Sequence, residues 1–434
     1  MILLVIGSVI GSGIFLVPGI VLRPVGNNVP LALSIWFAGG VLSLLGALTY
    51  GELSAMKPQA GGLYVYIRDC FGSFPAFLFG WTLFFVTGTG TIATLAVAFG
   101  VYLGQIVPIS PWMAKMMSLL MIAAITVVNV RGARQSANLQ NIATAIKAGG
   151  IVLMAIVLLW LGRGHHPVQT PSFSGMPTHS LLSGIGLALV SVLWAYEGWQ
   201  YAAYSAGEAK NPQRNLPLAF LIGTGALIAL YLFANAGYLA ALGGPGVAAS
   251  DRVAATAVAA VIGPGAAKLV ALMILIAIVS AANSCVLTLP RVYYAMAADG
   301  LFFRRLSEIH PRFQTPAFAI IAGSVWAALL AATGTFEQLL TYVVFIGWAF
   351  YALAAGCIFV YRRRQPNAAL PYRVPGYPWT PLIFIATVAA FVTNTIVAEP
   401  GRAAVGMAVV FAGAPAYLVW RKLKRQRAIV EEGG

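Results

Sequence analysis

The chain has 434 residues, of which 60% are hydrophobic and 9% are charged, and its mean hydropathy is +0.86. A soluble domain carries about 25% charged residues, so this composition excludes a soluble enzyme, a disordered chain and a disulfide scaffold. Apolar stretches of about 20 residues, the length that crosses a bilayer, recur along the whole sequence. We therefore expect an all-α membrane protein, folded as a single polytopic domain over residues 1–434 and surrounded by membrane lipid.

Apolar runs between polar breaks predict about twelve transmembrane helices. Several of these runs exceed about 25 residues, so we expect those helices to tilt, kink or extend beyond the bilayer. In chain order, the predicted spans are 1–22, 30–56, 74–107, 112–130, 137–162, 180–208, 216–242, 254–288, 315–333, 337–361, 379–397 and 402–421.

The positions of the basic residues predict the orientation. Of the 26 Lys and Arg residues, 19 lie in the loops after every second predicted helix or in the basic tail 421–434, and six lie in the opposite loops. Cytoplasmic loops carry the excess of Lys and Arg. Both termini are therefore expected in the cytoplasm, with the chain in the cell inner membrane. The basic tail is interpreted as a topology signal, and no nucleic-acid partner is expected despite the net charge of +15.

The cysteines and histidines show no pattern that suggests a site. Cys70, Cys285 and Cys357 form no spaced cluster, and the four histidines lie in predicted loops without ligand spacing. No disulfide, metal site or cofactor is expected.

Two segments are expected to interrupt helices at membrane depth. The first is 7–13, GSVIGSG, in which three glycines lower the cost of leaving helical geometry. Close helix packing through Gly7 and Gly11 is an alternative explanation. The second is 194–199, WAYEGW, which places a carboxylate and three aromatic residues in an apolar span.

The spacing of the two interruptions suggests an internal repeat. They lie about 187 residues apart, and each opens a block of five predicted helices. We expect a 5+5 inverted repeat, with repeat one at about 1–165, repeat two at about 175–365, discontinuous helices 1 and 6, and two further C-terminal helices over 375–421. In such transporters the substrate binds between the broken helices. Half-helix N-termini suit a carboxylate and freed carbonyls suit an ammonium, as in a zwitterionic amino acid.

Several motifs resemble the amino acid–polyamine–organocation (APC) superfamily. Within it, the chain is similar to the L-type amino acid transporters (LAT), which are light chains of heterodimeric transporters, and to their bacterial relatives. The resemblance covers nearly the whole chain. The matching stretches are GSVIGSGIF at 7–15, GGLYVYIRDCFG at 61–72, WAYEGWQY at 194–201, GEAKNPQRNLPLA at 207–219 and RVYYAMAADGLFF at 291–303.

The resemblance implies a substrate site. The backbone around Ile10, Gly11, Ser12 and Gly13 would hold the α-carboxylate, and the carbonyls of Trp194, Ala195 and Glu197 would accept from the α-amino group. Trp194 would also close over the substrate as a gate. The implied substrate-binding set is Ile10, Gly11, Ser12, Gly13, Trp194, Ala195, Tyr196, Glu197, Phe345 and Trp348, with no catalytic residue and no metal ligand.

Lys147 lies about ten residues inside the fifth predicted helix, where an ammonium needs partners. In the family, a lysine here occupies the site that sodium fills in sodium-coupled relatives, and it bridges helix 1 carbonyls and helix 8. The alternative is a lysine that extends to the interface. The family role argues against sodium coupling and leaves either plain exchange or coupling to protons.

Glu197 departs from many relatives, which have a small neutral residue here, whereas some that carry cationic amino acids have an acid. Its carboxylate could pair with a cationic side chain, help to hold the α-amino group or bind a proton. Alternatively, its neighbours satisfy it and it does not contact substrate.

Two further departures concern the partner and the first helix. Animal light chains join a heavy chain through a cysteine before helix 4, but this chain has Ser110, so no disulfide-linked heavy chain is expected. Six residues precede Gly7, or about 9 Å of helix, so either the inner half of helix 1 is short or its true start is missing from this sequence.

Together these features predict a sodium-independent exchanger (antiporter) of neutral L-amino acids that works by alternating access. The alternatives are a proton-coupled symporter, an exchanger that also accepts cationic amino acids through Glu197, and a substrate sensor built on a transporter fold. An enzyme is not expected, because the predicted spans contain no paired carboxylates, histidine cluster or nucleophile–base arrangement.

Overall fold

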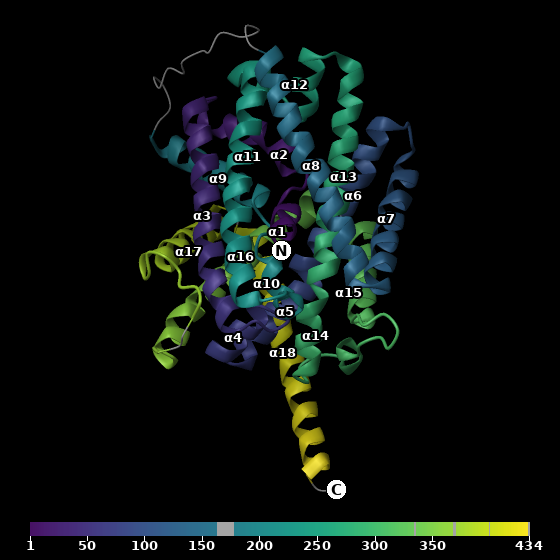
Figure 1. Ribbon diagram of the computed structural model, residues 1–434, viewed down its shortest axis with the longest axis vertical. Helices are drawn as coiled ribbons and strands as arrows, with labels where there is room; N and C mark the ends of the chain where they lie inside the picture. Colours follow the sequence, from purple (N-terminus) through teal and green to yellow (C-terminus); the bar gives the residue numbers. More distant parts are fainter. Residues whose placement is uncertain (163–177, 334–335, 368–369, 399, 433–434) are drawn as a thin grey trace.

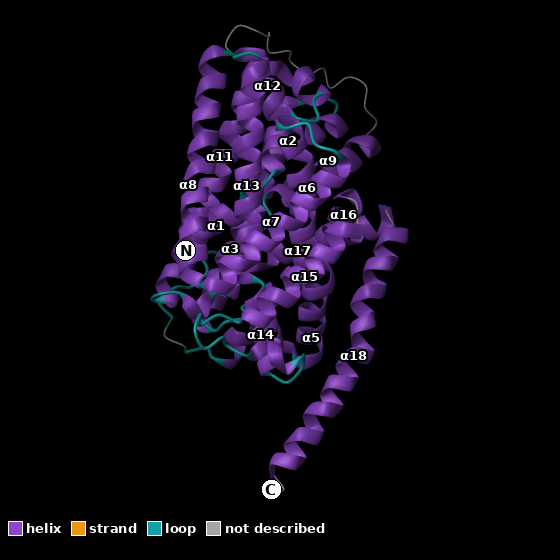
Figure 2. Ribbon diagram, turned by 90° about the vertical axis from the view of Figure 1, so that its right-hand side faces the viewer, coloured by secondary structure: helices purple, strands orange, loops and turns teal. Residues whose placement is uncertain are grey.

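The computed structural model describes residues 1–162, 178–333, 336–367, 370–398 and 400–432. Every regular element within these ranges is a helix, and Figure 2 shows the helices packed along one long axis. The predicted all-helical class is therefore confirmed. The predicted boundary between the two repeats, 165–175, lies outside the described residues.

The helices follow one another in the order shown in Figure 1. Those of the first half are α1 Ile2–Val9, α2 Gly13–Leu22, α3 Val29–Met56, α4 Leu63–Phe71, α5 Ser73–Thr82, the π-helical turn η2 Leu83–Thr87, α6 Gly88–Ile106, α7 Pro111–Arg131 and α8 Ala133–Leu161. Those of the second half are α9 Thr178–Ala195, α10 Tyr201–Tyr204, α11 Pro212–Ala249, α12 Val253–Val261, α13 Ala267–Thr288, α14 Pro290–Ala298, α15 Ala317–Thr333, α16 Phe336–Arg364, α17 Trp379–Ala398 and α18 Pro400–Glu432; short 3-10 turns include η3 Ala206–Glu208 and η5 Arg304–Ser307.

Within the described residues, eight helices are long and apolar enough to cross a membrane, and the bent pair α1–α2 makes a possible ninth. One predicted span is wrong: 254–288 is not a single helix, because α12 ends at Val261 and α13 begins at Ala267. Gly263 between them has φ 121°, and Pro264 has no N–H to continue a helix. The helix at the last predicted span, 402–421, is longer than expected, because α18 continues through the basic tail to Glu432.

Both predicted helix interruptions are present. Between α1 and α2 the chain bends by 52°, and Ile10 is extended with ψ 93°. α9 ends at Ala195 and α10 begins at Tyr201, with Gly198 between them at φ 120°. Figure 1 places α1 and α10 about midway along the bundle, and the two helices contact each other. The two breaks therefore meet inside the protein.

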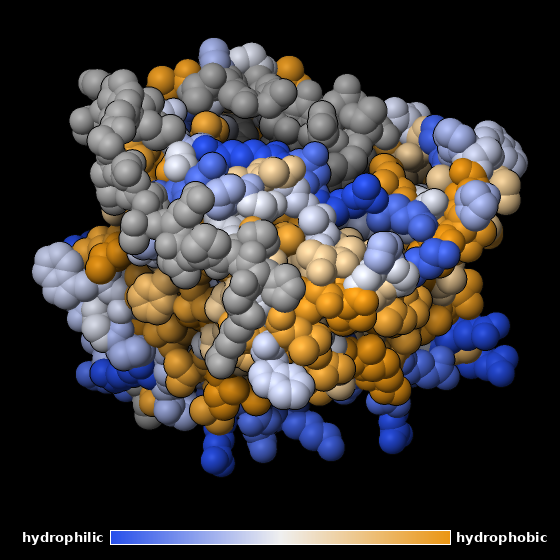
Figure 3. All heavy atoms as spheres, turned by 90° about the horizontal axis from the view of Figure 1, so that it is seen from above, coloured by the Kyte–Doolittle hydropathy of each residue, from blue (hydrophilic) through white to orange (hydrophobic). Residues whose placement is uncertain are grey.

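Ion pairs gather the loops into two sets at opposite ends of the bundle. Arg68 pairs with Asp299 at the end from which α18 extends, called here the α18 end, and Arg23 pairs with Asp251 at the other, called the α12 end. Looking down on the α12 end, Figure 3 shows hydrophilic residues near its centre, with apolar residues beside and below them.

Candidate functional site

A buried cavity lies where the two helix breaks meet. Its volume is ≈ 50 Å³, which is room for a few water molecules. Its walls come from α1, α2 and the break between them, from α9, α10 and the break between those two, and from α6 and α13. The lining residues are Ser8, Val9, Gly11, Ser12, Gly13, Thr91, Thr94, Leu95, Trp194, Ala195, Glu197, Tyr201, Ala281 and Cys285.

Most of the predicted site residues lie at this cavity, but not all of them. Six line it: Gly11, Ser12, Gly13, Trp194, Ala195 and Glu197. Ile10, Tyr196 and Trp348 are fully buried outside its lining. Trp348 packs against Tyr351, with ring centroids 5.8 Å apart, and so lies one layer behind the cavity. Phe345 belongs to α16, but its side chain is outside the described residues.

Glycine allows the two broken helices to approach closely. A Cβ at Gly13 would lie 3.0 Å from the Cα of Ala195, and a Cβ at Gly198 would lie 2.7 Å from the carbonyl oxygen of Ser8. Gly198 also adopts a positive φ that other residues rarely tolerate. Larger residues at either position would separate the two breaks and open the cavity wall.

Three polar atoms of residues that line the cavity have no partner within the described structure: Ser12 Oγ, Thr94 Oγ1 and Glu197 Oε2. Buried polar atoms normally form hydrogen bonds, so each calls for a ligand or water. Ser12 precedes α2, whose first turn has no side-chain cap. The N–H groups of such a helix start attract anions. The cavity therefore offers an anion-binding helix terminus and an acceptor carboxylate.

The other oxygen of Glu197 is held firmly. Oε1 accepts hydrogen bonds from Tyr351 Oη at 2.6 Å and from Gln200 Nε2 at 2.7 Å. Gln200 Oε1 in turn accepts from the backbone N–H of Gly198 at 3.2 Å. Neither Gln200 nor Tyr351 was predicted as a site residue, since no sequence pattern links α16 to the break after α9. Oε2 is thus the carboxylate oxygen without a hydrogen bond in the described structure, and the indole of Trp348 is near the carboxylate.

Lys147 is fully buried and supports the break in the first helix. Its Nζ donates to the carbonyl oxygens of Gly7 and Ile10, each at 2.6 Å. These carbonyls are freed where α1 ends, so the ammonium takes the place of the missing helical N–H donors. The expected bridge to α13 is not among the described contacts of Nζ.

Tyr231 of α11 joins the two breaks directly and was not predicted. Its hydroxyl lies 3.1 Å from the carbonyl oxygen of Ala195 and 3.3 Å from that of Val9, so it can donate to either. Its ring packs 5.0 Å from that of Tyr196. Tyr196 therefore helps to position α11 rather than lining the cavity.

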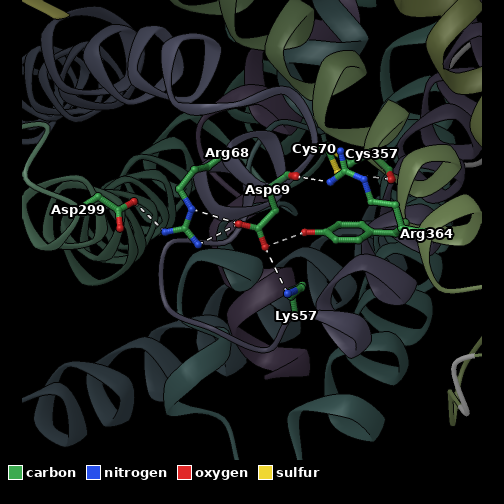
Figure 4. A network of polar contacts seen from close by, with 8 residues as sticks. Lys57, Arg68, Asp69, Cys70, Asp299, Cys357 and Arg364 are labelled. Carbon is green, nitrogen blue, oxygen red and sulfur yellow. Dashed lines mark hydrogen bonds and ion pairs between the residues drawn. The ribbon is translucent and has the colours of Figure 1, made fainter. Parts of the chain in front are cut away.

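A network of charged residues joins several segments at the α18 end, as Figure 4 shows. Asp69 of α4 accepts from Arg68 and pairs with Lys57 at 3.3 Å, while Arg68 Nη1 donates to Asp299 Oδ2 at 2.7 Å. Tyr64 also donates to Asp299, at 2.8 Å. Burial, and then the Asp299 carboxylate, raise the pKa of Tyr64 well above its ordinary value, so this hydroxyl stays protonated. The network ties α4 to α3 and to the turn after α14.

Two further ion pairs lie at this end. Glu52 of α3 is fully buried and accepts two hydrogen bonds from Arg362, at 2.8 and 2.7 Å. Glu208 of η3 pairs with Arg291 of α14 at 2.8 Å. Both acids therefore join segments far apart in sequence, which residue spacing does not reveal.

Comparison with known proteins identifies relatives along the whole chain. Residues 1–418 match the family model described as amino acid permease. The chain is 31% identical over 425 residues to the serine/threonine exchanger SteT of Bacillus subtilis, covering 97% of this chain and 95% of that protein.

Two human proteins are similarly related. The b(0,+)-type amino acid transporter 1 is 33% identical over 386 residues, covering 86% of this chain and 77% of its own. The cystine/glutamate transporter is 29% identical over 437 residues, covering 99% of this chain and 86% of its own.

Proposed function

Since this chain belongs to the amino acid permease family of the APC superfamily, we propose that it is a sodium-independent exchanger of neutral L-amino acids. It is a multi-pass membrane protein and an amino acid transporter, not an enzyme. The observation that carries the finer proposal is that both helix breaks meet at one buried cavity with unpartnered polar atoms.

The proposed binding mode follows from the polarity of the cavity. The substrate carboxylate lies at the start of α2, near Gly11, Ser12 and Gly13, where helix N–H groups attract anions. The ammonium lies near the backbone carbonyls freed at the end of α9, those of Trp194, Ala195 and Glu197, which leaves the Glu197 carboxylate to the substrate side chain. Trp194 closes over the side chain. The serine/threonine exchanger among the relatives makes serine and threonine the first substrates to test.

Lys147 supports sodium independence. Its ammonium already contacts the carbonyl oxygens of Gly7 and Ile10, which are the kind of ligands that a sodium ion would need. A fixed positive charge at this position also repels a second cation. Transport is therefore proposed to proceed without sodium, through alternate opening of the two ends around the cavity.

We extend the proposal to the architecture that the family implies. It comprises about twelve spans, the inverted repeat at 1–165 and 175–365, helices 11–12 over 375–421, and both termini in the cytoplasm beneath the inner membrane. Ser110 replaces the cysteine that links animal light chains to a heavy chain, and here its Oγ caps α7 by accepting from the N–H of Met113 at 3.3 Å. Transport is therefore proposed to need no disulfide-linked partner.

The test is uptake of labelled serine by purified protein in liposomes, with and without unlabelled serine inside. Uptake only into loaded vesicles, unchanged when choline replaces sodium, is the expected result. Uptake that requires sodium would overturn the proposed role of Lys147, and an absence of uptake of every neutral amino acid would overturn the substrate class.

A proton-coupled symporter is the second candidate, because Glu197 Oε2 is buried at the cavity without a partner and could take up a proton. The same liposomes distinguish the two functions. Uptake into empty vesicles that is driven by an inward proton gradient would establish symport and exclude obligatory exchange.

A further inference from the structure

An apolar groove lies apart from the cavity, between α18 and the neighbouring helices α5, α15 and the turn η2. Its volume is ≈ 630 Å³, and its walls include Trp81, Phe85, Trp326, Leu330, Val405 and Val409. The two indole N–H groups are already used: Trp81 donates to the carbonyl of Val409 at 3.1 Å, and Trp326 donates to that of Phe85 at 3.0 Å. The groove therefore presents hydrocarbon and is suited to an apolar occupant.

Below this groove, at the α18 end, basic residues gather around an aromatic contact. The Trp420 ring of α18 packs against Phe302 and Phe303, at centroid distances of 5.4 and 5.1 Å. One turn further on, the Lys424 side chain lies against Gly300, at 3.5 Å from the position of a Cβ there.

Four exposed side chains form what we call the basic cluster: Arg304 and Arg305, which follow Phe303 in sequence, and Arg421 and Lys424 of α18. Within the described chain none of the four forms an ion pair.

The distance between groove and cluster matches one membrane leaflet. From Trp420 to Val409 α18 rises about 16 Å, and half of the hydrocarbon core is about 15 Å. Figure 2 shows α18 running along the side of the bundle and beyond it at this end. We propose that one anionic phospholipid binds here, with an acyl chain in the groove and its phosphate at the basic cluster.

Charge complementarity favours a lipid over the other occupants. Clusters of Lys and Arg beside a transmembrane helix bind anionic headgroups. If the basic residues served only to orient the chain in the membrane, they would need no apolar groove beside them. A second copy seated groove to groove would bring two basic clusters together, and like charges repel.

The site adjoins the charged network of the α18 end. Gly300, which contacts Lys424, follows Asp299, the partner of Arg68. A lipid held between Arg304, Arg305 and α18 would therefore steady the turn that carries Asp299. The lipid site itself does not rest on which amino acid is carried.

The test is native mass spectrometry of the full chain, delipidated in detergent and titrated with phosphatidylglycerol or phosphatidylcholine. The cluster variant is Arg304→Ala/Arg305→Ala/Lys424→Ala. The matched control is Arg134→Ala/Lys210→Ala/Arg214→Ala, which removes three exposed charges from other loops of the α18 end. Gly406→Leu fills the groove and tests the acyl-chain contact independently.

We expect phosphatidylglycerol to bind at least about tenfold more tightly than phosphatidylcholine, because each headgroup–cation contact contributes to anion binding. The cluster variant should lose this preference, Gly406→Leu should weaken the binding of both lipids, and the control should keep both the affinity and the preference. Inorganic phosphate at millimolar concentration should not displace the lipid. Equal losses in the cluster variant and the control, displacement by phosphate alone, or a dimer that Gly406→Leu disrupts would each overturn the proposal.

Discussion

At the scale of single residues, the ammonium of Lys147 is the donor that makes the break between α1 and α2 possible. Its two hydrogen bonds to Gly7 and Ile10 satisfy carbonyls that α1 leaves open. Charged hydrogen bonds contribute about 1.5–3 kcal/mol each, and about 1.4 kcal/mol corresponds to tenfold in a rate. We expect Lys147→Ala to lower serine exchange by about tenfold or more in the liposome assay.

The matched control for this variant is Lys268→Ala, which removes an exposed lysine at the start of α13. It should transport normally. Size-exclusion profiles and melting temperatures should show that both variants remain folded. Wild-type exchange rates in Lys147→Ala would show that the break does not depend on the ammonium.

The charge of Glu197 is predicted to distinguish cationic from neutral substrates. Glu197→Gln retains an oxygen that can accept from Tyr351 and Gln200 but removes the charge from the cavity. A lost charge-assisted contact costs about 1.5–3 kcal/mol. We therefore expect any inhibition of serine exchange by lysine or arginine to weaken about tenfold, with a much smaller change for alanine. Equal changes for both classes in a competition assay would mean that Glu197 does not contact the substrate side chain.

At the scale of elements, the pair Arg68–Asp299 joins α4 to the turn after α14 and is predicted to help hold the α18 end closed. Its side chains are 29% and 26% exposed, and exposed pairs contribute about 0.2–1 kcal/mol. Asp299→Asn should therefore shift opening of this end by about two- to fivefold, since 1 kcal/mol is about fivefold.

Cys285 provides the measurement, because it lines the cavity and is buried. With Cys70 and Cys357 replaced by alanine, its labelling by a small thiol reagent reports access to the cavity. Asp299→Asn should speed labelling, and Glu308→Gln, which alters an exposed acid at the same end, should not. Unchanged labelling in Asp299→Asn would rule out a role for this pair in closure.

The elements that local chemistry determines could be predicted, whereas those that depend on distant packing could not. The breaks at Gly7–Gly13 and at Trp194–Trp199 were predicted because three glycines in seven residues favour a departure from helical geometry and a carboxylate is unusual inside an apolar span. The split near Gly263 had the same kind of signal, a Gly-Pro pair, but it was not recognised. Tyr231 and Tyr351 could not be predicted, because their partners lie in other helices. A single tyrosine within an apolar span also leaves no sequence pattern that would mark it as a site residue.

At the scale of the whole molecule, the ion pairs and the cavity are arranged along one axis. Arg23–Asp251 ties the α12 end, the Arg68–Asp299 network ties the α18 end, and the two breaks lie between them. In the proposed transport cycle, we expect the ion pairs of one end to separate while those of the other end remain intact. Because the breaks lie at mid-depth, small rotations there can expose the cavity to either end, which is the geometry that alternating access requires.

The direction of this axis in the membrane is the last prediction. The loops of the α18 end, together with the tail, hold 19 of the 26 basic residues, so the positive-inside rule places that end in the cytoplasm. Alkaline phosphatase, which is active only outside the cytoplasm, should be inactive when fused after Glu432 and active when inserted at Gly263, between α12 and α13. A fluorescent protein that folds only in the cytoplasm should give the reverse pattern. Phosphatase activity at Glu432 would invert the orientation and place the Arg68–Asp299 network outside the cell.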